Sequence, residues 1–189
     1  MKTLTWHRTG FDVDTHILIH HSKKKPEWLD QVLAQLENEP TNVLLVDLPT
    51  RNVGEARAFA MQQGKAPFLS FVDDDDWIAQ GVFERCLKEL TSEVMGVYTD
   101  IAWVEGPKDR VYDRTHKRSW SPKMQLTHPF EVLHLHVFRR WAAMPHLKEM
   151  AQYETAEEAL LMGLMVEFGP WKKVNFLGYY KRMNEGGSW

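Results

Sequence analysis

Four consecutive carboxylates, Asp73 to Asp76, follow the short apolar run Pro67–Val72. Adjacent carboxylates repel one another, so a folded chain keeps them together only where solvent, cations or other partners offset the repulsion. Mg²⁺ and Mn²⁺ prefer oxygen ligands and are commonly held by one or two carboxylates together with substrate phosphates. Alternate side chains share one face of a strand, so Asp73 and Asp75 can point together. The run predicts either a divalent-metal site or a solvated acidic segment in which Asp76 caps the following helix.

Two further pairs of polar residues could take part in chemistry. Glu157 and Glu158 open an apolar helical run, where a carboxylate could accept a proton. The helix dipole favours glutamates in any first turn, so an ordinary helix start explains the pair equally well. His134 and His136 alternate and therefore share one face of a strand, where they could line a site or belong to the core. They lack the Cys or His partners, at suitable spacing, that a zinc site needs.

The elements that must position these residues alternate between strand and helix in the N-terminal half. Short apolar runs predict strands at Thr15–His20, Asn42–Leu48 and Pro67–Val72. Helical spacing follows each run, over Trp28–Leu36, Val53–Gln63 and Val82–Leu90. Such alternation predicts an α/β fold with parallel strands joined by right-handed crossovers. Ligands bind beyond the carboxyl ends of such strands, where both Asp47 and the acidic run lie.

The second half is less regular. Strand character is predicted for Val94–Val104, Glu131–Phe138 and Val174–Lys181. Arg110–Lys123 is polar and reads as a loop or hairpin, and Thr155–Glu167 reads as a helix.

Length and composition predict one domain: 189 residues, of which 43% are hydrophobic, can bury a single core. Cys86 is the single cysteine, and the N-terminus lacks a signal-peptide pattern, so we expect a reducing, cytoplasmic setting. No run approaches the roughly 20 apolar residues of a transmembrane helix. The formal net charge of -3 provides no overall attraction to nucleic acid.

The segment RNVGEARAFAMQQGKAPFLSFVDDDD resembles glycosyltransferase family 2, in which an Arg-Asn-x-Gly-x-Ala-Arg helix precedes an apolar strand ending in Asp-x-Asp-Asp. The resemblance extends over nearly the whole chain. It implies a GT-A fold with a mostly parallel sheet in one domain, residues 1–189, with a nucleotide-binding half at about 12–105 and an acceptor-side half at about 106–189. It also implies inverting sugar transfer from a nucleoside diphosphate sugar, most commonly a UDP-sugar, to a hydroxyl acceptor, with Mn²⁺ or Mg²⁺.

The resemblance implies roles for the residues of the donor side. Asp75 would bind the metal, and Asp73 would help through the ribose or a water molecule. Asp47 would contact the nucleotide base. Arg57 would lie near the nucleotide or its phosphates, and Arg182 would assist at the diphosphate.

On the acceptor side, the family usually has a Glu-Asp pair at the start of a helix. Glu158 would therefore be the general base and Glu157 a supporting residue, with the base carried on an arm longer by one methylene. The tail NFLGYYKRMNEGGSW resembles the closing Tyr-x-x-Arg-x-His-x-x-Ser pattern of the family. Tyr179 and Arg182 fit that pattern, whereas Asn184 stands where histidine is frequent. Such a tail would act as a lid or fray as a free terminus.

Two alternatives stay open. One is a noncatalytic nucleotide-sugar-binding module with a degenerate GT-A fold, which the altered Glu-Glu pair would suit. The other is a nucleotidyltransferase, although THILIHHSKKKPEW lacks the glycine-rich loop that such enzymes usually need. The acceptor is open among a saccharide, a protein, a metabolite and a modified DNA base. Basic residues that could attract phosphate lie at Arg110, Arg114, His116, Lys117 and Arg118.

Overall fold

The structure is a computed structural model that describes residues 3–19, 26–48, 50, 52–105, 110–113, 119–128 and 134–183. Several residues named above lie outside these ranges, namely Arg114, His116, Lys117, Arg118 and Asn184. The same holds for the last residue of the predicted strand Thr15–His20 and for the first three residues of Glu131–Phe138. Within the described residues, no helix is long and apolar enough to cross a membrane.

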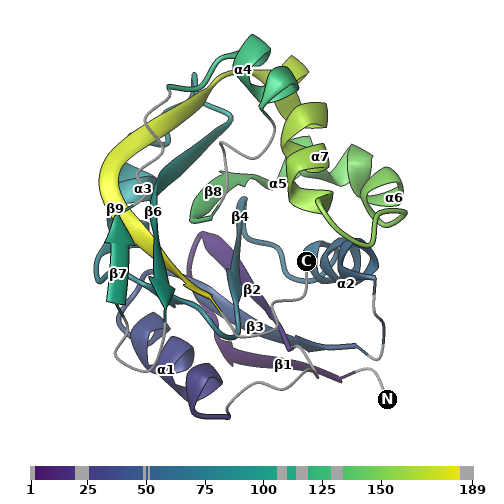
Figure 1. Ribbon diagram of the computed structural model, residues 1–189. Helices are drawn as coiled ribbons and strands as arrows, with labels where there is room; N and C mark the ends of the chain where they lie inside the picture. Colours follow the sequence, from purple (N-terminus) through teal and green to yellow (C-terminus); the bar gives the residue numbers. More distant parts are fainter. Residues whose placement is uncertain are drawn as a thin grey trace.

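One mixed sheet of nine strands organises the described residues (Figure 1). Its strand order is β1-β3-β2-β4-β8-β6-β9-β5, and β7 pairs with β6 outside this path. The strands are β1 Thr3–Arg8, β2 Val13–Leu18, β3 Asn42–Asp47, β4 Phe68–Asp73, β5 Trp77–Ile78, β6 Gly96–Glu105, β7 Arg110–Asp113, β8 His136–Arg139 and β9 Trp171–Met183. The helices are α1 Pro26–Leu36, α2 Val53–Met61, α3 Val82–Glu89, α4 Pro122–Thr127, α5 Arg140–Ala143, α6 Leu147–Met150 and α7 Glu157–Leu164, with 3₁₀ turns η2 Met144–His146 and η3 Met165–Phe168.

The predicted α/β class is confirmed, and the pairing of the strands refines it. β2 lies between β3 and β4 and runs parallel to both, as the strand-helix alternation predicts. β1 is antiparallel to β3, and β8 is antiparallel to both β4 and β6. β9 returns parallel to β6. Parallel pairing therefore joins β2 to β3 and β4, and β6 to β9, whereas the other pairs of the sheet are antiparallel.

Apolar side chains cover both faces of the sheet. On one face, α1 and α3 bury Val32, Leu36 and Phe83 together with Cys86. On the other face, α2, α5, α6 and α7 contribute a second cluster that includes Met61, Ala142, Met150, Leu161 and Met162. Figure 1 shows these two groups of helices on opposite sides of the strands. Two packed layers of helices hold the strand ends in place between them.

The acidic run does not lead directly into a helix. Asp73 ends β4, Asp74 and Asp75 form a turn, and the short strand β5 separates Asp76 from α3. The N-cap of α3 is Gly81, and the Glu39 carboxylate accepts hydrogen bonds from the N–H groups of Gly81 and Phe83. Because Glu39 already satisfies the first amides of the helix, the interpretation of Asp76 as a helix cap, one of those left open by the sequence, is wrong.

Candidate active site

The first turn of α2 is tied to the chain just beyond α6. Asn52 caps α2 by accepting a hydrogen bond from Glu55 N–H at 2.8 Å, and its amide donates to Ala151 O at 3.0 Å. Gly54 N–H donates to Tyr153 O at 3.2 Å. A Cβ at Gly54 would lie 2.3 Å from Met150 O, so only glycine permits this approach. The Asn-x-Gly part of the RNVGEAR segment thus fixes where α2 points its later residues.

Arg57, one turn further along α2, is buried among carboxylates from two other elements. Its Nη2 donates to Asp73 Oδ1 at 3.0 Å, at the end of β4. Its Nε lies 3.1 Å from Glu157 Oε1, and its Nη1 contacts Glu158 Oε1, both at the start of α7. The guanidinium carbon also lies 4.8 Å from the centre of the Phe71 ring. One guanidinium therefore joins three of the carboxylates that the sequence singles out.

His134 lies on the other side of the same carboxylates. Its Nε2 is 3.6 Å from Asp73 Oδ2 and 3.4 Å from Glu158 Oε2. Its ring stacks on those of His136 and Tyr179, with centroid separations of 5.6 and 5.0 Å. Burial lowers the pKa of His134 well below its usual range, although the Asp73 carboxylate opposes this shift. His134 is therefore a neutral imidazole between the two carboxylates at neutral pH.

The two histidines share one face, as their alternation predicts. His134, His136 and Glu158 offer ligand atoms within 4.8 Å of one another. However, Arg57 already contacts Glu158 at this place, and a bound cation would face its guanidinium. Charge repulsion makes this trio a poor cation site.

Carboxylate oxygens of Asp73, Asp75 and Asp76 lie within 4.8 Å of one another. Asp75 and Asp76 are buried, with exposed fractions of 8% and 2%. Burial raises the pKa of Asp76 well above its usual range, and the charges of Asp73 and Asp75 raise it further. An all-oxygen set of crowded, desolvated carboxylates fits a hard divalent cation, which would offset this repulsion. The predicted pair Asp73 and Asp75 is thus brought together, and Asp76 joins it.

The last strand, β9, contacts the segment Asp73–Asp76, called the acidic turn below. The hydroxyl of Tyr179 donates to Asp76 Oδ2 at 2.8 Å, and Arg182 N–H donates to Asp76 Oδ1 at 2.7 Å. Lys181 Nζ lies 3.8 Å from Asp73 Oδ2. β9 therefore supplies both hydrogen-bond donors and positive charge to this turn.

The Arg182 side chain has a fixed place beside the acidic turn. Its Nη1 donates to Asp75 O at 2.6 Å, and its guanidinium lies over the rings of Trp28 and Trp77, at 4.2 and 4.7 Å. Trp77 in turn stacks on Tyr180, with ring centroids 5.7 Å apart. The residue expected at the diphosphate is thus part of a strand, held between two indole rings.

Asp47 lies at the same edge of the sheet but not in the carboxylate cluster. The register pairs Leu18 of β2 with Val46 on one side and with Asp73 on the other. Asp47, the residue after Val46, therefore ends β3 two strands from Asp73. At about 4.8 Å between strands, the two backbones are about 10 Å apart. This separation leaves room for a ligand across the strand ends.

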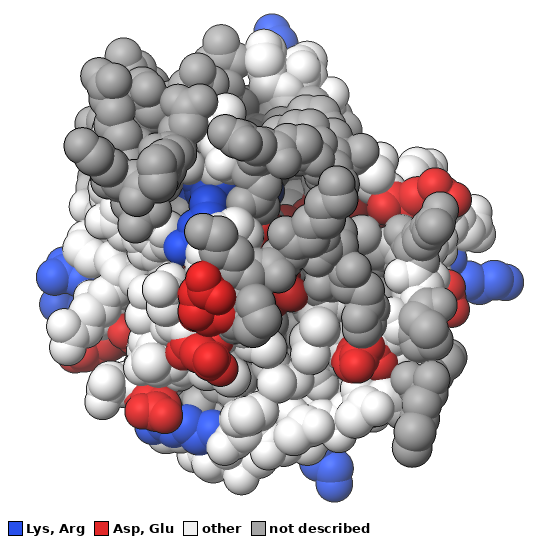
Figure 2. All heavy atoms as spheres, turned by 60° about the horizontal axis from the view of Figure 1, so that its bottom comes forward, with Lys and Arg blue, Asp and Glu red and all other residues white. Residues whose placement is uncertain are grey.

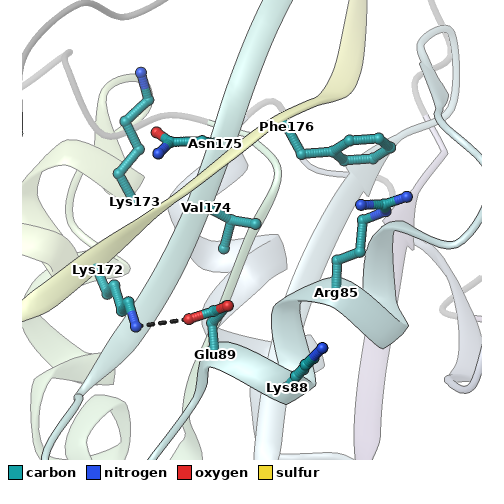
Figure 3. Close-up of a pocket in the computed structure, with 8 residues that line it drawn as sticks. All are labelled: Arg85, Lys88, Glu89, Lys172, Lys173, Val174, Asn175 and Phe176. Atoms are coloured by element: carbon teal, nitrogen blue, oxygen red, sulfur yellow. Dashed lines mark ion pairs between the residues drawn. The ribbon is translucent and has the colours of Figure 1, made fainter.

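Acidic side chains gather near the middle of one face of the molecule, with basic side chains beside them (Figure 2). Two cavities lie elsewhere. One, of about 340 Å³, lies between α3 and β9 and is lined by residues that include Arg85, Glu89 and Lys172 (Figure 3). The other, of about 510 Å³, lies between α2 and η2 to α6. Neither is lined by the carboxylates around Arg57 or by those of the acidic turn, so the chemistry of the side chains, and not cavity size, locates the site.

The fold and the acidic strand end define a GT-A glycosyltransferase domain. The model of glycosyl transferase family 2 matches residues 18–149, so the chain belongs to this family. No curated protein matches the sequence significantly.

Solved structures of S. aureus TarS share the fold. TarS 1-349 matches with a TM-score of 0.65 and 16% identity over 90% of this chain and 60% of that one. Its complex with UDP-GlcNAc matches with a TM-score of 0.66 and 15% identity, over 93% and 59% of the two chains. Its complex with UDP matches with a TM-score of 0.67 and 12% identity, over 91% and 60%. The chain thus spans about 60% of the length of TarS 1-349.

Proposed function

We propose that this chain is a metal-dependent, inverting glycosyltransferase that moves a sugar from a nucleoside diphosphate sugar to a hydroxyl acceptor. The observation that carries the proposal is the contact of Arg57 with Asp73 on one side and with Glu157 and Glu158 on the other. It brings the donor-side carboxylate of Asp73 close to the two glutamates that include the candidate general base. Membership of the family supports this function, and the UDP and UDP-GlcNAc complexes of TarS support a UDP-sugar as donor.

The residues of the acidic turn would hold Mn²⁺ or Mg²⁺. Asp75 and Asp73 are the proposed ligands, and Asp76 lies close enough to be a third. Such a cation, when bound, offsets the negative charge that develops on the leaving diphosphate. Asp47, across the strand ends, is proposed to contact the nucleotide base. Arg182 is proposed to act at the diphosphate from its place above the acidic turn.

Glu158 is proposed as the general base. It takes the proton of the acceptor hydroxyl while that oxygen attacks the anomeric carbon from the face opposite the leaving group. The new glycosidic C–O bond forms as the bond to the diphosphate oxygen breaks, which inverts the configuration. Glu157 supports the base from the same turn of α7, and both residues are largely buried.

A second candidate is a noncatalytic nucleotide-sugar-binding module. One observation favours it: both glutamates of the altered Glu-Glu pair contact Arg57, so both carboxylates already have a partner within the protein. In this case the acidic turn would bind a nucleotide without turnover.

Incubation with a panel of nucleoside diphosphate sugars and Mn²⁺ separates the two candidates. Released nucleoside diphosphate supports the transferase, whereas calorimetric binding of UDP without turnover supports the module. Glu158→Gln should lower turnover by at least about 100-fold while it preserves UDP binding, because only proton transfer is lost. Glu157→Gln is the matched control and should cost less. Full activity of Glu158→Gln would disprove its role as the base.

A further inference from the structure

The guanidinium of Arg57 is surrounded by carboxylates of the protein itself. Nε, Nη1 and Nη2 each face a different carboxylate, those of Glu157, Glu158 and Asp73. The side chain is buried, and Phe71 lies against it. The resemblance to the family leads one to expect Arg57 at the nucleotide or its phosphates. These contacts instead direct it toward the candidate base.

We propose that Arg57 is a positioning residue that sets the place of Glu158 relative to the donor-side carboxylate Asp73. The inference rests on the proposed function and deepens it. Arg57 acts through the two carboxylates and touches neither the donor nor the acceptor. It joins the donor-side half of the chain, which supplies α2 and β4, to the acceptor-side half, which supplies α7.

The geometry of arginine suits this task. A planar guanidinium presents donors in a fixed fork and can serve several carboxylates at once, whereas a lysine ammonium is a point charge on a flexible stem. The helix that carries Arg57 is also held in place, because Asn52 and Gly54 anchor the first turn of α2 to the chain beyond α6. His134 contacts Asp73 and Glu158 from the other side. The distance between these two carboxylates is therefore set from both directions.

Arg57→Lys is the test, because it keeps the positive charge and removes the fork. We expect kcat for the best donor to fall at least about tenfold. The KM for that donor, and the Kd of UDP measured by calorimetry with Mn²⁺, should stay within about twofold of the wild type. A loss confined to kcat is the signature of a misplaced base, because in this proposal Arg57 touches no atom of the donor.

Arg140→Lys is the matched control. Arg140 is another largely buried arginine, which pairs with Asp14 and donates to Ala66 O and Gln63 O. The Arg140→Lys substitution makes the same chemical change away from the carboxylate cluster. The kcat should therefore stay near the wild-type value even if the variant is less stable.

Two results would overturn the inference while the proposed function stands. If the wild type is active but Arg57→Lys raises the Kd of UDP about tenfold at unchanged kcat, then Arg57 is a phosphate ligand. If neither kcat nor Kd changes, Arg57 positions nothing. A wild-type chain that turns over no donor is a different failure, because it refutes the proposed function first and the inference with it.

Discussion

The hydroxyl of Tyr179 donates a hydrogen bond of 2.8 Å to Asp76 Oδ2. The Tyr179 hydroxyl oxygen also accepts a hydrogen bond of 3.1 Å from Asp73 N–H, so one hydroxyl spans both ends of the acidic turn. Burial raises the pKa of Tyr179 well above its usual range, and the carboxylates of Asp76 and Asp73 add to this shift. Tyr179 therefore stays protonated and keeps donating. The last strand of the sheet thereby fixes the geometry of a turn formed about one hundred residues earlier.

Tyr179→Phe should weaken the acidic turn without altering its charge. Loss of the buried hydroxyl removes a donor from Asp76 and an acceptor from Asp73 N–H, which should lower the free energy of unfolding by about 1–3 kcal/mol. The Mn²⁺ concentration that gives half-maximal thermal stabilisation should rise. Tyr180→Phe is the control, because the ring of Tyr180 stacks on Trp77 and its hydroxyl is not part of the turn's hydrogen bonds to Asp76. Equal effects of the two variants would contradict the role of Tyr179.

The acidic turn offers a matched pair of variants for the metal site. Asp75 belongs to the cluster of carboxylate oxygens, whereas its neighbour Asp74 is buried but does not. Asp75→Asn should abolish thermal stabilisation by Mn²⁺ and lower turnover at least about tenfold, because it removes a charged oxygen ligand. Asp74→Asn should retain most of both properties. Full metal-dependent activity of Asp75→Asn would refute the assignment.

The local sequence pattern was enough to predict on which strand or helix several residues of the site lie. Asp73 ends an apolar strand and Arg57 lies on a helix with clear apolar spacing, and both were placed correctly on these elements. Glu157 opens a helix as expected. The contacts of Arg57 with Asp73, Glu157 and Glu158 were not predicted, because these residues lie on separate elements.

Contacts between distant segments were not predictable from local pattern. A capping role was one interpretation open for Asp76, because a helix follows it in the sequence, yet Glu39, which follows α1, caps that helix. The strand β1 was missed because its side chains are mostly exposed and polar, so it carries no apolar run. A usable signal existed for β9: strand alternation puts Tyr179 and Lys181 on one face, and both reach the acidic turn.

His16 should make the stability of the fold depend on pH. It is fully buried in β2, and burial, aided by the charges of Arg140 and Arg57, lowers its pKa to about 3. In the unfolded chain its pKa is near the ordinary histidine value of 6.5, so the unfolded state binds a proton that the folded state cannot hold. The contribution of His16 to the free energy of unfolding is complete above pH 6.5. It is lost as the pH falls toward about 3, by at most about 1.4 kcal/mol per pH unit.

His16→Phe removes the titrating group while it preserves a ring beside Phe71, whose centroid lies 6.0 Å from that of His16. Urea unfolding between about pH 7 and about pH 5 should show a flatter decline of stability for this variant than for the wild type. His7→Gln, at an exposed position of β1, should leave the decline unchanged. Parallel stability curves of His16→Phe and the wild type would show that His16 does not cause the decline.

Two helical glycines should respond to alanine in opposite directions. A Cβ at Gly54 would lie 2.3 Å from Met150 O and 2.4 Å from Tyr153 O. Both atoms belong to the backbone and cannot rotate away, so α2 must shift, at a cost of about 1–3 kcal/mol. At Gly163 in α7, a Cβ meets no heavy atom within 4 Å, so alanine should stabilise the helix by about 0.5–1 kcal/mol.

Urea unfolding of Gly54→Ala and Gly163→Ala measures both effects directly. Gly54→Ala has a second expected consequence, because α2 carries Arg57 and any shift of the helix moves the guanidinium away from Glu158. Its kcat should therefore fall even where the variant is fully folded, while Gly163→Ala stays active. If Gly54→Ala were as stable and active as Gly163→Ala, the anchoring of α2 against the chain beyond α6 would have no part in placing the base.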